Sequence, residues 1–453
     1  MKRLILVILL FLGFSSVIFA VSNPWRLNAT SSGYGFYNAN ISIYAPSLFF
    51  NSFGFIGAGT NSPRSLLDIY EGVAINNQPV ILNVGENVPM QNTISWLFSI
   101  GVSAQKISAT LGSDGLPIIS FSNSTSGYLE VLHCGNILCN SGNILTTVDS
   151  SATVGYYSAI IIGQDGLPVI SHMDSTNGDL KVVHCGNIFC NSGNRATTVD
   201  STGSVGMYTS IAIGSDGFPI ISYMDSTNGD LKVLHCGKVL CNASNTATTI
   251  DSTGLVGYYT SITIGSDGLP LVSYQDSTNG DLKVVHCGSL LCSAGNTITT
   301  VDSVGSVGMF TSITIGSDGL GIISYQDSGN NDLKVLHCGT ILCSAGNTIT
   351  TVDSVGTTGW FATMMIGSDN LPIITYQDSG NSDLKVVHCG NLLCSSSNSP
   401  LTLESTGNVG FYSTIIQGSD SLPIIFYLDL VTNYGLKVLH CGSTSCLPYW
   451  TRR

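Results

Sequence analysis

A His-Cys pair recurs seven times in this chain, and a second Cys follows each pair five residues after the first. The histidines lie 51 residues apart, except for a last interval of 52: His133, His184, His235, His286, His337, His388 and His440. All fourteen cysteines belong to these motifs: Cys134, Cys139, Cys185, Cys190, Cys236, Cys241, Cys287, Cys292, Cys338, Cys343, Cys389, Cys394, Cys441 and Cys446. Imidazole and thiolate bind transition metals, and thiols also do redox chemistry or form disulfides. The motif therefore has three possible uses.

The geometry of a strand favours the disulfide. Neighbouring side chains of a strand point to opposite faces, so an adjacent His and Cys diverge, and each unit lacks a fourth metal ligand. A redox site would favour Cys-x-x-Cys in a reducing compartment. A disulfide requires only that each pair flank the turn between two antiparallel strands. We predict one disulfide in each unit, with metal binding and free thiols as the alternatives, and expect each His to pack or hydrogen-bond between units.

A second set of repeated residues could bind a ligand. Turns such as "DSTNGD" supply carboxylates and amides, and the links between units, such as "VDSTGSVGMY", supply aromatic rings. The candidates are Asp174, Asp179, Asp225, Asp230, Asp276, Asp281, Asp327, Asp332, Asp378, Asp383, Tyr208 and Tyr259. Carboxylates accept hydrogen bonds from sugar hydroxyls and rings stack on sugars, so carbohydrate is the favoured ligand; clustered carboxylates also suit Ca²⁺, and no other cofactor is expected. The alternative is that these residues only form good turns and pack between units.

The similarity among the units argues against catalysis, and we expect no catalytic residues. An active site needs different groups in different roles at one place, whereas the polar positions here repeat, and residues 92–446 contain only two glutamates, Glu130 and Glu404. A binding or adhesion module is therefore favoured. A carbohydrate-active hydrolase or lyase with paired aspartates is one alternative, and a protein-interaction scaffold is the other.

The elements that position these residues are short strands. The unit around Tyr274 contains four runs rich in Val, Ile, Thr and Tyr, "YTSITIG", "LPLVSYQD", "DLKVVHC" and "NTITTVDS", separated by turn residues. Several runs are apolar on both faces, so each sheet must be covered on both sides. Seven such sheets arranged radially cover one another, and the period is that of propeller blades. The fold class is therefore all-β, a seven-bladed β-propeller.

The ends of the repeat region predict how the ring closes. The seventh unit has three runs and then only "LPYWTRR", so its fourth strand is missing. Residues 92–98 precede the first unit and match a fourth strand, since Asn92 lies 20 residues before Gly112 as Asn296 lies 20 residues before Gly316. We predict that this segment pairs with the third strand of the seventh unit, because an open ring would leave two exposed edges.

Composition and the N-terminus place the chain outside the cytoplasm. The 453 residues are 43% hydrophobic and 9% charged, with a net charge of −13, and no basic patch is available for nucleic acid. Residues 1–20 are typical of a signal peptide, with an uncleaved membrane anchor as the alternative. We expect a β-rich attachment segment at 21–91, the propeller at 92–446 and a tail at 447–453, secreted or at the cell surface. The oligomeric state is not indicated.

The stretch "SITIGSDGLPLVSYQDSTNGDLKVVHC" resembles the blade repeats of secreted, sialidase-like and BNR-type propellers. The resemblance covers about residues 92–446 and implies the architecture alone. A sialidase uses three arginines to hold the substrate carboxylate, but Arg195 is the only arginine in this range, and the Asp-box tryptophan is absent. Upstream, "FIGAGTNSPRSLLDI" at 55–69 is similar to an element of phage tail fibres and bacterial surface stalks.

Overall fold

In the computed structural model the chain divides into two compact units, Met1–Val88 and Pro89–Arg453. Residues 91–99, 106–431 and 435–447 are described in full, and of residues 1–90 the structure describes only the backbone of seven strands. The predicted signal segment at 1–20 and residues 448–453 of the tail lie outside the described residues. The described elements are all strands, so the all-β prediction is confirmed. None of the described residues forms an apolar helix long enough to cross a membrane.

The N-terminal unit contains a five-stranded sheet and a small hairpin. The sheet has the order β1 (Trp25–Thr30), β2 (Gly33–Asn38), β3 (Leu48–Asn51), β4 (Ile56–Ala58) and β5 (Leu67–Ile69), and the hairpin is β6 (Ala74–Ile75) with β7 (Gln78–Pro79). The element at 55–69 supplies β4 and β5, which pair in parallel. Its similarity to tail fibres stays a prediction.

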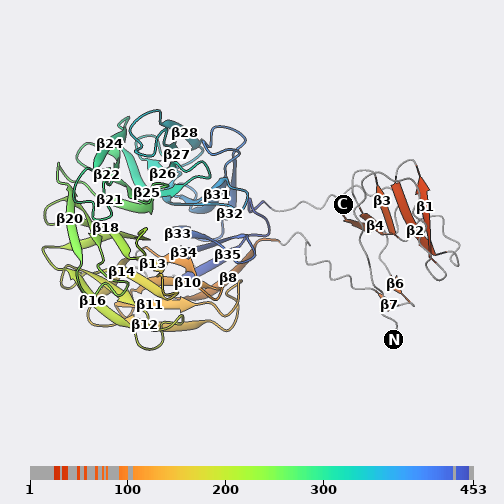
Figure 1. The fold of residues 1–453 in the computed structure, drawn as a ribbon, viewed down its shortest axis with the longest axis horizontal. Coiled ribbons are helices and arrows are strands. Elements are labelled where there is room, and N and C mark those ends of the chain that lie inside the picture. Colours follow the sequence, from red (N-terminus) through yellow and green to blue (C-terminus); the bar gives the residue numbers. More distant parts are fainter. Residues whose placement is uncertain are drawn as a thin grey trace. The chain divides into compact units, whose positions relative to one another are not determined.

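The second unit is a ring of seven four-stranded antiparallel sheets (Figure 1). The first three blades are β9 (Ser108–Leu111), β10 (Pro117–Asn123), β11 (Tyr128–His133) and β12 (Ile144–Asp149); β13 (Val154–Ile162), β14 (Pro168–Asp174), β15 (Asp179–His184) and β16 (Arg195–Asp200); and β17 (Val205–Ile213), β18 (Pro219–Asp225), β19 (Asp230–His235) and β20 (Thr246–Asp251). The next two are β21 (Tyr258–Ile264), β22 (Pro270–Asp276), β23 (Asp281–His286) and β24 (Thr297–Asp302); and β25 (Val307–Ile315), β26 (Gly321–Asp327), β27 (Asp332–His337) and β28 (Thr348–Asp353). The sixth is β29 (Trp360–Ile366), β30 (Pro372–Asp378), β31 (Asp383–His388) and β32 (Ser399–Glu404), and the seventh is β33 (Val409–Gln417), β34 (Pro423–Asp429), β35 (Gly435–His440) and β8 (Thr93–Ser99).

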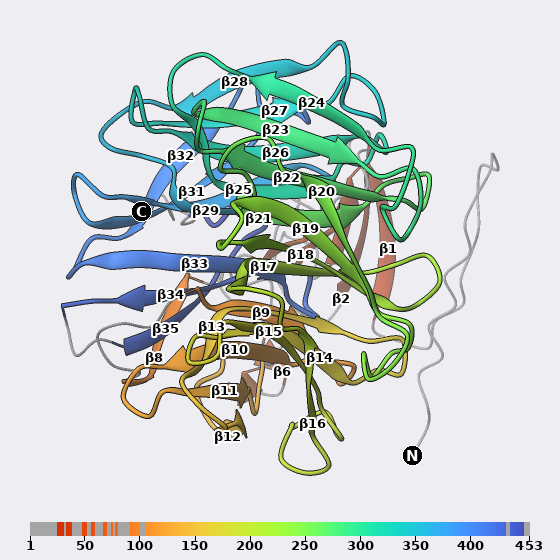
Figure 2. The same cartoon turned by 90° about the vertical axis from the view of Figure 1, so that its left-hand side faces the viewer.

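The first strand of each blade is the innermost. Each innermost strand contacts that of the next blade, and β33 contacts β9, so the ring is continuous. Figure 2 shows the same sheets turned by 90°. The seven-bladed propeller predicted from the repeats is confirmed.

The predicted closing strand pairs as expected. β8 lies antiparallel to β35, with Ile94 opposite Leu439 and Thr93 opposite His440. The side chain of Asn92 binds the last disulfide loop from both sides: its Nδ2 donates to the carbonyl of Cys446 at 2.9 Å, and its Oδ1 accepts from the amide of Gly442 at 2.9 Å. Both ends of the repeat region therefore complete one sheet.

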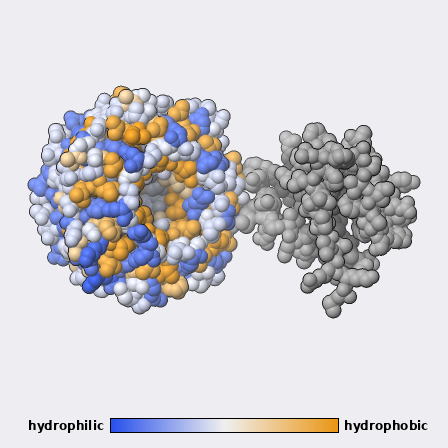
Figure 3. Space-filling view, in the orientation of Figure 1, coloured by the Kyte–Doolittle hydropathy of each residue, from blue (hydrophilic) through white to orange (hydrophobic). Residues whose placement is uncertain are grey.

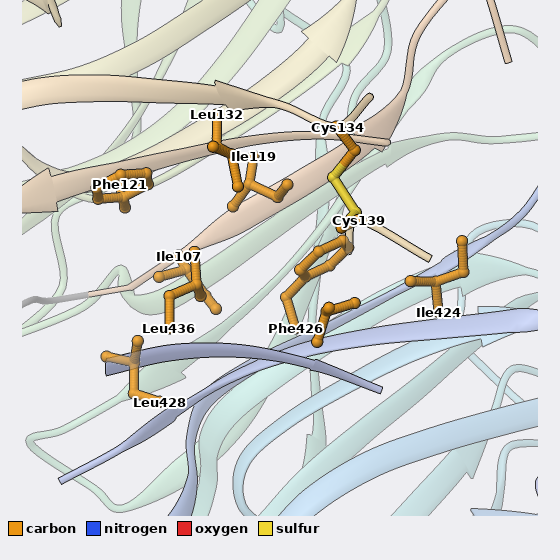
Figure 4. Packing of buried hydrophobic residues seen from close by; sticks show 11 residues of the cluster. Ile107, Ile119, Phe121, Leu132, Cys134, Cys139, Ile424, Phe426, Leu428 and Leu436 are labelled. Carbon is orange, nitrogen blue, oxygen red and sulfur yellow. A yellow bond between two sulfur atoms is a disulfide. The ribbon is translucent and has the colours of Figure 1, made fainter. Parts of the chain in front are cut away.

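The core lies between neighbouring blades. The second strand of a blade is buried along its whole length, as in β22, because adjacent sheets cover both of its faces. Figure 4 shows the cluster between the first and seventh blades, where Phe121 and Leu132 pack with Phe426 and Leu436. The disulfide Cys134–Cys139 belongs to the same cluster. Each sheet therefore depends on its neighbours for its core.

Candidate functional site

The seven predicted disulfides are present. Every Cys is bonded to the Cys five residues away, with Cα–Cα distances of 4.7 to 4.9 Å, and none of the described cysteines is free. All fourteen are buried, with 0–1% exposed. Within the described ranges, no group of three or more His, Cys, Asp or Glu residues is placed to hold a metal ion. The Cys motif is therefore a cross-link and not a metal or redox site.

The repeated histidines bond within their own blades. His286 Nε2 lies 2.8 Å from Oδ2 of Asp267, which belongs to the turn between the first and second strands of the same blade. The other six histidines pair in the same way with Asp114, Asp165, Asp216, Asp318, Asp369 and Asp420. The expectation that they hydrogen-bond between blades is wrong, because the end of the third strand lies beside the first turn of its own sheet. Packing between blades does occur at His133, whose ring lies 4.7 Å from that of Phe189 in the second blade.

The first Asp of each candidate turn is used by the turn itself. Asp276 is 2% exposed; its Oδ1 accepts from the amides of Thr278 and Asn279, and its Oδ2 accepts from Nδ2 of Asn279. Asp174, Asp225, Asp327 and Asp378 are equally buried and hold their turns with the same kind of bonds. These five carboxylates are therefore occupied within their own blades. Oδ2 of Asp327 also pairs with Lys334 Nζ at 2.7 Å, and Oδ2 of Asp276 lies 3.7 Å from Lys283 Nζ.

The second Asp of each candidate turn begins the third strand and is half-buried. Asp281 lies directly opposite Asp276 across the hairpin. Burial raises the pKa of Asp281, and the Asp276 carboxylate raises it further. The pKa values of Asp179, Asp230, Asp332 and Asp383 are raised for the same reasons. These carboxylates are the more accessible half of the candidate set.

A different carboxylate connects neighbouring blades at six of the seven junctions. Asp251 ends the last strand of the third blade and accepts from Tyr274 Oη at 2.8 Å and from Lys283 Nζ at 2.7 Å, both in the fourth blade. Asp200, Asp302, Asp353 and Glu404 contact the equivalent Tyr and Lys of the blade that follows them. Asp149 of the first blade likewise pairs with Lys181 of the second, so six lysines of the propeller form ion pairs with a carboxylate of the preceding blade.

The second blade has His172 at the Tyr position of this triad. Its Nε2 lies 3.5 Å from Oδ2 of Asp149, and its Nδ1 accepts from the amide of Gly155 at 3.3 Å. Burial lowers the pKa of His172 to about 4, although Asp149 acts to raise it. His172 is fully buried, and it is therefore a structural replacement for Tyr.

The triad is replaced where the ring closes. Phe98 of β8 takes the position of the inter-blade Asp, Phe121 that of Tyr, and Glu130 that of Lys. The rings of Phe98 and Phe121 lie 5.3 Å apart, and Glu130 accepts from Asn123 Nδ2 at 3.1 Å. The divergence of the first unit is therefore an adaptation to the junction with the closing strand.

The innermost strands surround a cavity of about 510 Å³ on the ring axis, and Figure 3 shows the hollow at the centre of the propeller. Six blades place an aromatic ring around it at the same repeat position: Tyr157, Tyr208, Tyr259, Phe310, Phe361 and Tyr412. Successive rings of this set contact one another in tilted pairs, with centroid distances of 4.3 to 4.8 Å and interplanar angles of 49° to 54°. We call these six residues the aromatic ring. Tyr208 and Tyr259, two of the sequence candidates, belong to it.

The backbone holds the aromatic ring in an unusual conformation. All six residues have φ between 47° and 55°, in the left-handed region that non-glycine residues rarely adopt. The strand pairing shifts register at the same place, as between Met207 and Ser210. Such a bulge inserts one extra residue into the inner strand, and the side chain of that residue no longer follows the alternation of side chains between the two faces of the sheet. The bulge therefore explains why these side chains converge on the axis.

A second layer of the cavity carries hydroxyl groups two residues further along the innermost strands. These are Ser108, Ser210, Ser261, Ser312, Thr363 and Thr414, with Ala159 in the second blade. Ser261 Oγ accepts from the amide of Ile313 in the next blade at 3.2 Å, and Ser108, Ser210 and Ser312 make equivalent bonds. The hydroxyls join the blades and keep the cavity wall polar.

The seventh position of the aromatic ring is Lys106 in the first blade. It has the same left-handed conformation, with φ of 45°, and it lines the cavity. Its Nζ donates to the carbonyl of Thr209 at 2.5 Å. Burial lowers the pKa of Lys106 to about 8. Our sequence reasoning missed this residue, although counting back 51 residues from Tyr157 finds it.

The ten aspartate candidates do not line this cavity, whereas the two tyrosine candidates do. Among the described lining residues there is no Asp, Glu or His. The structure thus separates the predicted set into carboxylates at the hairpins and aromatic rings on the axis.

Comparison with known proteins identifies the fold. No family model and no curated protein sequence matches the chain. Among solved structures, a catalytically inactive virginiamycin B lyase from Staphylococcus aureus with quinupristin is similar, with 12% identity and a TM-score of 0.52 over 77% of this chain and 99% of that one. An ulvan lyase bound to a GlcA(1-4)Rha3S fragment has 12% identity and a TM-score of 0.52 over 78% and 96%. At this identity the likeness extends to architecture alone, and this chain has the fold of a seven-bladed β-propeller.

Proposed function

We propose that this chain is a secreted or surface-tethered, non-catalytic propeller that binds carbohydrate at the cavity on its axis. The aromatic ring carries the proposal. Sugar-binding sites combine flat apolar surfaces, on which the C–H faces of a sugar can stack, with a few fixed hydrogen-bonding groups. The six aromatic side chains and the hydroxyl layer beside them supply both in one cavity.

The size of the cavity supports a small ligand or the end of a longer one. Its volume of about 510 Å³ lies within the range of about 300–1,000 Å³ that is usual for ligand sites. The half-buried Asp281 and its four equivalents add hydrogen-bond acceptors at the hairpins. In this proposal the hairpin carboxylates contribute outer contacts or hold Ca²⁺, while the axial cavity provides specificity.

The remaining parts of the chain fit this role as proposals. Seven buried disulfides are typical of proteins that fold in an oxidising compartment, which supports export by the segment at 1–20. The segment at 21–91 would then attach the propeller to a surface and give the protein an adhesive function.

A glycan array tests the proposal. The full mature chain is applied with and without a chelator, and we expect binding to a restricted group of glycans. Tyr259→Ala should abolish that binding because it interrupts the aromatic ring. Ile349→Ala, on the outermost strand β28 and 41% exposed, should leave it unchanged.

The same experiment separates the alternatives. Chain cleavage of a bound glycan that is lost in Asp281→Asn would establish a paired-carboxylate enzyme. If the chain binds no glycan on the array but captures a protein from a cell surface, a protein-interaction scaffold would be favoured. Binding that disappears with chelator would assign Ca²⁺ to the site.

A further inference from the structure

Lys106 differs from every other lysine of the propeller in its surroundings. Lys181, Lys232, Lys283, Lys334, Lys385 and Lys437 form ion pairs with carboxylates, and Lys238 is exposed on a disulfide hairpin. Lys106 has no carboxylate partner among the described residues, and its ammonium is held by the Thr209 carbonyl. An ammonium has three donors, so the contact with Thr209 leaves two for a ligand.

The cavity around Lys106 contains no negative group among the described lining residues. The other polar side chains that line this cavity are those of Tyr157, Tyr208, Tyr259 and Tyr412, together with serines and threonines. Burial raises the pKa of Tyr259 to about 12 and also raises those of the other three tyrosines. These hydroxyls keep their protons at neutral pH and can donate hydrogen bonds.

The charge of the cavity lining is therefore positive, whereas the whole chain has a net charge of −13. Aromatic side chains by themselves also attract cations, but the Lys106 ammonium in the same cavity repels cations. One positive charge surrounded by neutral donors matches a group with one negative charge. A phosphate monoester with two charges would have only half of its charge balanced.

We infer that Lys106 is the anion-recognising residue of the axial cavity, and that it binds the carboxylate or sulfate ester of an acidic saccharide. The inference rests on the proposed binding role of the same cavity. The aromatic ring stacks on the sugar, and the Lys106 ammonium gives a charge-assisted hydrogen bond to the acidic group. The first blade has a lysine at this repeat position, whereas the other six blades have an aromatic residue. Lys106 therefore also fixes the orientation of a ligand, which six equivalent aromatic residues would leave undetermined.

The first experiment measures binding by saturation-transfer NMR and calorimetry with glucuronate, glucose 6-sulfate and glucose. We expect the wild type to bind one of the two anions more tightly than glucose. Lys106→Met should weaken binding of that anion by about tenfold or more, so that the preference of the protein for the anion over glucose is lost. Lys238→Met, which removes an exposed positive charge, should change neither. Equal affinity for glucose and both anions, or an unchanged preference in Lys106→Met, overturns the inference.

A second measurement uses the wild-type protein and does not depend on any variant folding. Acetic anhydride labels lysines at pH 8, and mass spectrometry compares Lys106 with Lys238 in the presence of acetate, sulfate, glucuronate or glucose. Protection of Lys106 by the anions alone supports the inference. If small anions protect it while no sugar binds, the anion site stands and the proposed carbohydrate function fails. If no anion protects it, the anion site itself is rejected.

The affinity for the anion should also depend on pH in a defined direction. Lys106 carries its charge below its lowered pKa of about 8, so binding should be full near pH 6.5 and lost as the pH rises above about 8. A site that used an ordinary lysine would keep its affinity to about pH 10. Persistence of anion binding at pH 9.5 contradicts a role for Lys106.

Discussion

At the scale of single residues, the repeated lysines of this propeller and the carboxylates between its blades are largely buried and paired with one another. Asp251 shows the arrangement: it lies at the end of one blade and binds Tyr274 and Lys283 of the next. The Lys283 ammonium also lies 5.9 Å from the centre of the Tyr274 ring. A buried carboxylate and ammonium satisfy each other, and removing one leaves the other uncompensated. The triad therefore couples adjacent sheets.

Asp251→Asn should lower the free energy of unfolding by roughly 3 kcal/mol, because the buried Lys283 loses its nearer counter-charge and keeps only Asp276 at 3.7 Å. Asp281→Asn is the matched control. The pKa of Asp281 is raised by burial and by Asp276, so the neutral side chain is tolerated and the unfolding midpoint in urea should hardly change. Equal losses in the two variants would show that the triad has no special role.

The difference in stability between the wild type and Asp251→Asn should depend on pH. Burial acts to raise the pKa of Asp251, but the hydrogen bonds from Lys283 and Tyr274 outweigh it, so the pKa is lowered. The stability that this carboxylate contributes is present above the unfolded-state pKa of about 3.9 and is lost as the pH falls through the folded-state value. In urea titrations between pH 7 and pH 2, the difference between wild type and Asp251→Asn should therefore shrink below about pH 4.

At the scale of elements, the disulfide hairpins secure the end of each sheet. Asn296 holds the loop between Cys287 and Cys292: its Nδ2 donates to the carbonyl of Cys292 at 2.7 Å, and its Oδ1 accepts from the amide of Gly288 at 3.1 Å. The disulfide itself is buried against the preceding blade. The hairpin is therefore fixed covalently, by hydrogen bonds and by packing.

Reduction of the disulfides should lower the thermal midpoint while the far-ultraviolet spectrum at room temperature stays unchanged. Each short loop contributes roughly 2 kcal/mol on the chain-entropy model, but the sheets keep their hydrogen bonds and cores. Calorimetry checks the first part and circular dichroism the second, with alkylation confirming that fourteen thiols became free. An unchanged midpoint would mean that the cross-links do not limit stability.

The closing strand gives a sharper comparison. Asn92→Ala and Asn296→Ala each remove the same two hydrogen bonds and should cost about 2 kcal/mol. Only Asn92→Ala weakens the junction between the two ends of the chain, so hydrogen exchange in 93–99 and 435–440 should rise in that variant alone. Exposed edges also favour pairing between molecules, and light scattering should detect dimers. Equal exchange in the two variants would argue against a special closing junction.

At the scale of the whole molecule, the propeller should unfold as one body, because its core clusters cross from blade to blade. Val284 of the fourth blade packs in one cluster with Ile323 and Leu336 of the fifth. Val284→Ala should lower the midpoint of a single transition by the equivalent of about 2 kcal/mol, and increased hydrogen exchange should appear in both blades. A separate low-temperature transition limited to the fourth blade would contradict this cooperativity.

Several features of the molecule followed from the sequence because they are local or periodic. Alternating turns and β-branched runs predicted the strands, and the 51-residue period predicted their number. Even a long-range pairing was accessible: the repeat left one strand missing at the end of the chain and one extra before the first unit. The Cys spacing likewise predicted cross-links, since a short loop between antiparallel strands brings both residues together.

Only the tertiary structure decided which polar residues are bound by their own turns and which line the axial cavity. Asp276 and its equivalents were predicted to bind a ligand because a carboxylate recurs at that position. A carboxylate that follows a strand can instead accept hydrogen bonds from the amides of its own turn, as Asp276 does. The amino-acid sequence is the same in both cases. The position of Lys106 depends on the left-handed backbone conformation that it shares with the six residues of the aromatic ring. The convergence of these residues arises only when seven sheets close into a ring, because the residues that meet on the axis are at least 51 positions apart in the chain.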